Sequence, residues 1–253
     1  MCGRYLVTTP PEAIRALFRY REQPNFPPRY NIAPTQPVPI VRMTQGEKHF
    51  ALVRWGLIPP WVKDPRGFSL LINARAETVH DKPAFRNAIK RRRCLFPADG
   101  FYEWKSDGNR KRPFMARPKD GGPMAFAGLW ENWIGPNGEE VETAAIITTE
   151  ANREMGAVHH RAPVIVPPEQ YDFWLDCGNV GEQEASSLFM RAPDGAMEVF
   201  EVSSLVNHVA NDTAELLKPY DPSTEPAPEP PKPKAPRRPA PKQPEDTGQG
   251  SLF

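Results

Sequence analysis

Cysteine is scarce in this 253-residue chain, and the positions of its cysteines exclude two common kinds of structural site. The three cysteines, Cys2, Cys94 and Cys177, include no CxxC pair and form no ligand-like array with the five histidines. A disulfide framework needs more cysteines, and a structural zinc site needs clustered Cys and His ligands. We therefore expect neither, and the sequence indicates no metal ion and no cofactor.

Long apolar runs and an excess of one charge are also missing. No segment approaches the roughly 20 apolar residues of a transmembrane helix, and the N-terminus lacks the basic and then apolar stretches of a secretion signal. These absences predict a soluble, cytoplasmic protein of a reducing compartment, with no membrane partner. The net charge is +1, so overall basicity does not indicate nucleic-acid binding. Two local basic runs, residues 90–93 and 110–112, are expected to be solvated surface charge.

Large aliphatic residues are absent from residues 222–244, where many of the 32 prolines gather. Such a segment cannot bury enough apolar surface to offset its ordering entropy, and proline favours extended polyproline II. We therefore predict one globular domain over residues 1–220. Residues 221–253 are predicted to form a disordered, proline-rich tail.

Strand-like segments dominate the rest of the chain, and turn signals such as Gly135-Pro136-Asn137-Gly138 separate them. The expected helices are short, and the first, Pro11–Tyr20, has Thr9 as its expected cap. Many short strands with few helices predict a mainly antiparallel, barrel-like α+β domain. The expected strands are 4–8, 37–43, 50–57, 94–96, 101–105, 113–117, 124–130, 141–149, 162–166 and 197–203. The other expected helices are 83–90, 150–158, 168–175 and 213–217.

The N-terminal sequence Met1-Cys2-Gly3 carries a specific chemistry if Met1 is removed, as it is when a small residue follows. Cys2 then has an α-amine with an ordinary pKa near about 7.7–8.0 beside a thiol near about 8.5. With an aldehyde, the amine forms an imine and the thiol closes a five-membered thiazolidine. Because both nucleophiles share one carbon framework, the second step is effectively intramolecular. Many proteins begin Met-Cys, so this feature taken alone is weak.

Three further segments carry groups that suit proton transfer and anion binding. Asn73 and Arg75 are two residues apart and share one face if the segment is extended. Glu103 lies among aromatic residues, where burial would raise its pKa. His159 and His160 precede Arg161 and lead into an expected strand. Taken singly, each segment favours a structural role: a turn amide for Asn73, a partner of a core arginine for Glu103, and an interior hydrogen-bonded imidazole for His159.

Together with Cys2, these segments resemble the SOS response-associated peptidase family of abasic-site crosslinking proteins. The resemblance extends from Cys2 to about Pro219 and includes three more motifs, Tyr30–Thr35, Trp55–Trp61 and Val206–Leu217. Several ordered motifs over nearly a whole domain make the resemblance specific. It implies that the protein senses abasic sites in single-stranded DNA during the DNA-damage (SOS) response and captures them covalently, with possible lyase-type and peptidase activities.

The resemblance also implies roles for individual residues. Cys2 would be the covalent residue, Asn73 and Glu103 would position and protonate the sugar, and His159 would assist ring opening or reversal. Arg4 and Arg75 would hold the phosphates. Trp61 and Trp104 would stack on bases or cap the turn of the strand.

Two departures from the family pattern concern the histidine motif. Ala162 stands where the family usually has methionine, which we expect to alter packing and not chemistry. The doublet His159-His160 leaves the catalytic imidazole open, although the spacing to Arg161 and Pro163 selects His159. If the stretch is extended, the two rings point to opposite faces and cannot both enter one pocket.

Two other classes of protein compete with this interpretation. An N-terminal-nucleophile hydrolase would use the free α-amine to activate the Cys2 thiol against an amide. A non-catalytic module would bind single-stranded DNA with Cys2 incidental. Amide turnover would support the first, and reversible binding alone would support the second.

The last five residues resemble the pentapeptide by which bacterial repair and replication proteins bind the sliding clamp, with Gln249, Leu252 and Phe253 as the contact residues. Leu252 and Phe253 are the only large apolar residues after Tyr220, and a short motif of this kind carries a real risk of chance matching. We expect a peptide ending in Phe253 to bind the clamp, and alanine at both apolar positions to abolish binding without affecting DNA crosslinking. Failure of the peptide to bind the clamp in a fluorescence-anisotropy titration would contradict the prediction.

Overall fold

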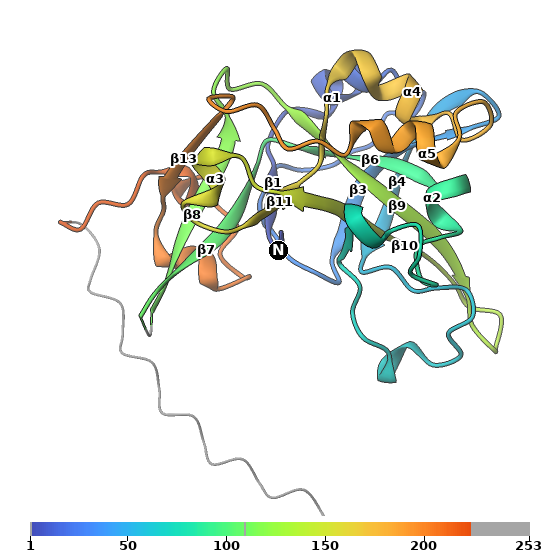
Figure 1. The fold of residues 1–253 in the computed structure, drawn as a ribbon. Coiled ribbons are helices and arrows are strands. Elements are labelled where there is room, and N and C mark those ends of the chain that lie inside the picture. The colour runs from blue at the N-terminus through green and yellow to red at the C-terminus, as the bar shows by residue number, and fades with distance from the viewer. Residues whose placement is uncertain (1, 109, 224–253) are drawn as a thin grey trace, which may run out of the picture.

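The computed structural model describes residues 2–108 and 110–223 (Figure 1). Residues 224–253, which make up all but the first three residues of the tail predicted to be disordered and include those predicted to bind a sliding clamp, lie outside this described part, and both calls stay predictions. The described part contains thirteen strands and a set of short helices. None of these helices has the length and apolar character needed to cross a membrane.

Five strands form a closed barrel. They are β3 (Pro37–Thr44), β4 (Glu47–Trp55), β10 (Glu140–Glu150), β9 (Met124–Ile134) and β6 (Arg93–Ala98). The strand β3 pairs with β4, β4 with β10, β10 with β9, β9 with β6, and β6 again with β3. Only the pair of β4 and β10 is parallel within this ring. Closure leaves no free edge, and it confirms the prediction of a mainly antiparallel, barrel-like α+β domain.

A second, five-stranded sheet lies beside the barrel. Its order is β13 (Met197–Glu201), β8 (Arg110–Pro118), β7 (Gly100–Asp107), β1 (Tyr5–Val7) and β2 (Arg29–Ile32). In Figure 1 the strands β13, β8 and β7 lie on the left and the barrel on the right, and the segment leading into β1 lies between them. The chain passes from barrel to sheet at Asp99, between β6 and β7, and this carboxylate accepts hydrogen bonds from the backbone and hydroxyl groups of Thr8 and Thr9.

The strand β1 joins the sheet to the barrel through an aromatic cluster. The Tyr5 ring is fully buried and meets Trp55, Phe126 and Phe96 edge-on, at centroid distances of 5.3, 6.0 and 6.5 Å. These partners come from β4, β9 and β6, three strands of the barrel. Edge-to-face pairs of this kind add stability beyond their buried area, so the first strand is held rigidly against the core.

The helices are short, as predicted, but several boundaries differ. The α-helices are α1 (Pro11–Phe18), α2 (Ala88–Arg91), α3 (Arg153–Gly156), α4 (Tyr171–Leu175) and α5 (Glu182–Ala185). Single 3₁₀ turns complete the set: η1 (Pro65–Gly67), η2 (Ala76–Thr78), η3 (Pro168–Gln170), η4 (Ser186–Leu188), η5 (Ser204–Asn207) and η6 (Ala214–Leu217). Thr9 does not cap α1: Pro10 occupies the cap position, and the Thr9 hydroxyl is bonded to Asp99. The cap prediction was therefore wrong, because a tertiary partner took the hydroxyl.

Two strands were missed and one was divided. The strands β2 and β5 (Asn73–Arg75) are only four and three residues long, and pairing with β1 and β10 stabilises them. The expected strand 162–166 is split into β11 (Arg161–Pro163) on β10 and β12 (Ile165–Val166) on β9. Such short strands depend on partners that are distant in the chain, so local periodicity does not mark them.

The basic run 90–93 is not simply surface charge, which corrects the expectation for its last residue. Arg93 is 1% exposed and donates to the carbonyl oxygens of Trp174, Ile89, Asp176 and Val180, over 2.6–3.1 Å. Removal of this guanidinium would take one hydrogen-bond donor from each of these four carbonyl groups, a loss that is costly in a protein interior. Arg93 therefore holds the segment that follows α4 against β6, and it is unavailable to a phosphate.

Candidate functional site

The N-terminal segment brings Cys2 into the interior between the sheet and the barrel. Cys2 is fully buried, and its carbonyl oxygen accepts a hydrogen bond from Asn73 Nδ2 at 2.9 Å. Asn73 stands at the start of β5, which pairs in parallel with β10. The other amide atom, Asn73 Oδ1, is buried and accepts no hydrogen bond from any residue in the described ranges. Two predicted site residues, 71 positions apart, are thus in direct contact.

Glu103 reaches the same place from β7. The ladder between β1 and β7 continues beyond β1 through a 2.9 Å hydrogen bond from Tyr102 N to Arg4 O, which brings the next residue of β7 beside the chain start. The Glu103 side chain is buried, with 4% exposed. Burial, and after it the negative charge of Glu103, raise the pKa of the Cys2 thiol well above its ordinary range. The thiol is therefore neutral near pH 7 in the chain that carries Met1.

Arg4 and Trp104 are held in place by protein contacts. Arg4 Nη1 donates to Asn31 Oδ1 and to Val206 O, both at 2.7 Å, and burial lowers the pKa of this guanidinium. The Arg4 guanidinium carbon lies 5.6 Å from the centre of the Trp104 ring, and Trp104 Nε1 donates to Asn207 Oδ1 at 2.8 Å. Both side chains are thus held in position by the segment that contains η5.

Asn31 is a positioning residue that sequence reasoning did not single out. It is fully buried, and its Nδ2 lies within hydrogen-bond distance of three carbonyl oxygens, those of Val206, His208 and Asn211, at 2.7–3.2 Å. Asp212 completes the connection by accepting from the Asn31 backbone N–H at 3.0 Å. Asn31 and its partners belong to two motifs noted in the sequence, Tyr30–Thr35 and Val206–Leu217. Only the fold shows that these two motifs are in contact.

Trp61, Asn73 and Arg75 line one cavity of about 360 Å³. Its remaining walls are mainly apolar, and Lys82 adds a second cation that the sequence reasoning did not assign. Trp61 is 58% exposed, and Arg75 is also exposed. An exposed indole beside two cations is an arrangement that suits a base and its phosphate.

The two histidines lie before β11 and not within a strand. The Arg161 backbone N–H donates to His159 Nδ1 at 3.0 Å, and the same ring nitrogen lies 3.2 Å from the Arg161 carbonyl oxygen. The His159 and His160 rings are stacked, with centroids 4.5 Å apart and planes 27° from parallel. Because this stretch is not extended, the two rings lie together, and the expectation of opposite faces does not apply. His159 is the less exposed of the two.

Arg161 anchors the histidine segment to the rest of the site. Its guanidinium forms a two-pronged ion pair with Glu77 at 2.6 and 3.0 Å and also donates to the Thr148 carbonyl at 2.5 Å. The hydrogen bond from Arg161, opposed by partial burial, lowers the pKa of Glu77. Thr148 of β10 is flanked by Arg75 of β5 and by Pro163 of β11. The strand β10 therefore carries Asn73 and Arg75 on one side and the histidine segment on the other.

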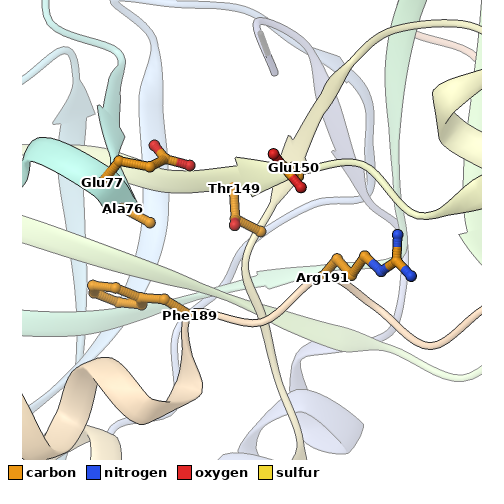
Figure 2. A pocket seen from close by; sticks show the side chains of 6 residues that line it. All are labelled: Ala76, Glu77, Thr149, Glu150, Phe189 and Arg191. Carbon is orange, nitrogen blue, oxygen red and sulfur yellow. The ribbon is translucent and has the colours of Figure 1, made fainter.

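A second cavity of about 430 Å³ lies next to this ion pair (Figure 2). It is lined by Ala76, Glu77, Thr149, Glu150, Phe189 and Arg191. None of the residues predicted from the sequence to act chemically or to bind DNA lines this cavity, so the chemistry has to be sought at Cys2.

Comparison with known proteins decides the family. A family model described as "SOS response associated peptidase (SRAP)" matches residues 1–209. The chain belongs to the SRAP family. Within this SRAP chain, the described ranges contain no group of three or more His, Cys, Asp or Glu side chains able to hold a metal ion.

Relatives of this SRAP chain include bacterial and vertebrate proteins. It is 39% identical to "Abasic site processing protein YoaM" of Bacillus subtilis over 221 residues, which cover 86% of this chain and 97% of that protein. It is 30% identical to "Abasic site processing protein HMCES" of Gallus gallus over 265 residues, with coverage of 87% and 78%.

Solved structures show the same fold. The crystal structure of a Bacteroides thetaiotaomicron protein superposes with a TM-score of 0.79 at 25% identity, covering 87% of this SRAP chain and all of that one. A phage-related protein from Bordetella bronchiseptica has a TM-score of 0.65 at 32% identity, with coverage of 79% and 94%. The barrel with its companion sheet is therefore a shared architecture.

Proposed function

We propose that this SRAP protein processes abasic sites in single-stranded DNA, as part of a DNA-damage response, by forming a covalent thiazolidine through Cys2. The observation that carries the proposal is that Cys2, Asn73 and Glu103 lie together. Asn73 donates a hydrogen bond to the Cys2 backbone, and the charge of Glu103 acts on the Cys2 thiol. The printed names of the YoaM and HMCES relatives support the choice of substrate.

The reaction begins after removal of Met1. Removal of Met1 frees the α-amine of Cys2, and we assign the first attack to this amine. Its nitrogen adds to the aldehyde carbon of the ring-opened deoxyribose and gives a carbinolamine. Protonation of the hydroxyl group expels water and leaves an iminium ion. The Cys2 sulfur then adds to the same carbon and releases its proton, which closes the thiazolidine with net loss of one water molecule.

Proton transfer is assigned to two groups of this chain. Glu103 is buried beside Cys2; it would take a proton from the α-ammonium group, pass it to the departing hydroxyl, and later accept the thiol proton. His159, held at Nδ1 by the Arg161 backbone, would donate to the ring oxygen when the sugar opens, or act in reversal. Asn73 would hold the Cys2 backbone through Nδ2 and present Oδ1 to the substrate.

DNA binding is assigned to the cavity at Trp61 and to the surface at Trp104. Trp61 and Arg75 are exposed and would take a base and a phosphate. Arg4 and Trp104 are held in the protein, and we propose that they contact the strand from these fixed positions. The predicted sliding-clamp contact of Gln249, Leu252 and Phe253 would keep the protein near exposed single strands.

Intact-mass measurement tests the proposed function. We expect the purified protein to lack Met1 and, with an oligonucleotide that contains one abasic site, to gain the oligonucleotide mass less one water. An uncleaved N-terminal tag should prevent this adduct, because the amine of Cys2 is then an amide. Full crosslinking by the tagged protein would contradict the mechanism.

The same samples separate the competing classes. An undamaged oligonucleotide of the same sequence is the matched control and should give no adduct. Turnover of an amide substrate without any DNA adduct would favour the hydrolase. Reversible binding of both oligonucleotides without an adduct would favour the non-catalytic module.

A further inference from the structure

The exposed Trp61 belongs to a loop that has a small apolar core of its own. The Trp61 loop, residues 58–70, connects β4 to β5, and a bridge between Leu57 and Leu71 closes its base. Its core contains the buried side chains of Ile58, Val62 and Trp133, with Phe68 and Val141 packed against them. This core is separate from that of the barrel. The loop is therefore positioned by a few specific contacts.

Trp133 is the central contact. It comes from β9, is 4% exposed, and its Nε1 donates to the Val62 carbonyl oxygen at 2.6 Å. Val62 directly follows Trp61, so this bond fixes the backbone next to the residue that carries the exposed indole. A second bond, from Ile58 N to Thr143 Oγ1 at 3.0 Å, fixes the start of the loop.

The Trp61 ring itself is in contact with Phe68. The two rings meet edge-on with centroids 5.6 Å apart, and Phe68 packs against the loop core that contains Trp133. The exposed indole is thereby kept at the wall of the cavity that Asn73 and Arg75 also line. An indole fixed in advance loses less conformational entropy when a base stacks on it.

We propose that Trp133 is a positioning residue for DNA binding, acting through the backbone of Val62 to hold Trp61 at the cavity wall. This inference rests on the proposed function, because it takes single-stranded DNA as the ligand. Trp133 itself is buried and acts only through the loop.

A double-mutant cycle tests the coupling. Trp133→Phe keeps an aromatic ring in the loop core but removes the donor to Val62. We expect it to raise the dissociation constant for an undamaged single-stranded oligonucleotide about three-fold, with a smaller change in the maximum crosslinking rate. In the Trp61→Ala background the same substitution should change the dissociation constant by less than about 1.5-fold, because the residue it positions is gone.

Trp174→Phe is the matched control. Trp174 is also fully buried, and its Nε1 likewise donates to a backbone carbonyl, that of Cys94 at 2.8 Å. This variant should lose stability in a urea titration without weakening DNA binding. Equal weakening by Trp133→Phe in both backgrounds, or no weakening in either, would overturn the positioning role.

The two failures are distinguishable. If the wild type crosslinks abasic DNA while Trp133→Phe binds undamaged DNA normally, only the positioning role fails. If the wild type neither binds the undamaged strand nor forms an adduct, the proposed function fails and the positioning role fails with it.

Discussion

Cys2→Ala is expected to abolish every crosslink to abasic DNA that survives denaturation. The substitution leaves an α-amine at the new N-terminus, since alanine is small enough for Met1 removal, so a reversible imine can still form. Without sulfur the thiazolidine cannot close, and the imine hydrolyses on unfolding. A denaturing gel of protein incubated with a labelled abasic oligonucleotide measures the loss.

Two further variants separate the amine from the thiol. Cys2→Ser should give a weak adduct that appears only after borohydride reduction traps the imine. Cys94→Ala is the matched control, because Cys94 is as fully buried as Cys2 but lies in the barrel strand β6, and it should crosslink normally. A heat-stable adduct of Cys2→Ala without reductant would show that another residue forms the bond.

Glu103→Gln is expected to slow crosslink formation by about 10²–10⁴-fold, the usual contribution of a positioned acid or base. The amide has the shape of the carboxyl group but cannot transfer a proton, so affinity for undamaged single-stranded DNA should change little. Single-turnover crosslinking rates, measured at saturating protein, give the effect on chemistry, and fluorescence anisotropy gives the effect on binding.

The sign of the rate change discriminates between two roles of Glu103. Its charge helps to raise the pKa of the Cys2 thiol, so its neutralisation would lower that pKa and give more thiolate. If thiol ionisation limited the reaction, Glu103→Gln would accelerate it; if proton transfer by Glu103 limits it, the rate falls. Acceleration would therefore contradict the acid–base assignment.

A matched control for a buried carboxylate is available on the barrel strand β9. Glu131 is 2% exposed and is paired with Arg92 at 3.0 Å, and burial raises its pKa. Glu131→Gln removes the same charge from a similar environment that contains no predicted site residue. It should affect the free energy of unfolding and leave the crosslinking rate unchanged.

The sequence by itself determined the features that depend on the groups within one residue or on a local pattern of residues. The paired nucleophiles of Cys2 lie on one residue, so their chemistry needs no fold to be recognised. Apolar runs bounded by turn residues marked the longer strands, such as β3, β9 and β10, because the composition of a run is a local property. The abundance of short strands then indicated the barrel-like class.

Only the tertiary structure decided which distant groups meet. Asn73 contacts Cys2 across 71 positions, and Asn31 joins β2 to the segment around η5 across 175. Arg93, written in the sequence as one member of a basic run, is buried among carbonyl groups, and the two histidines stack because their stretch is not a strand. Strand pairing and loop packing set these contacts, and they depend on partners far along the chain, which no local period of the sequence encodes.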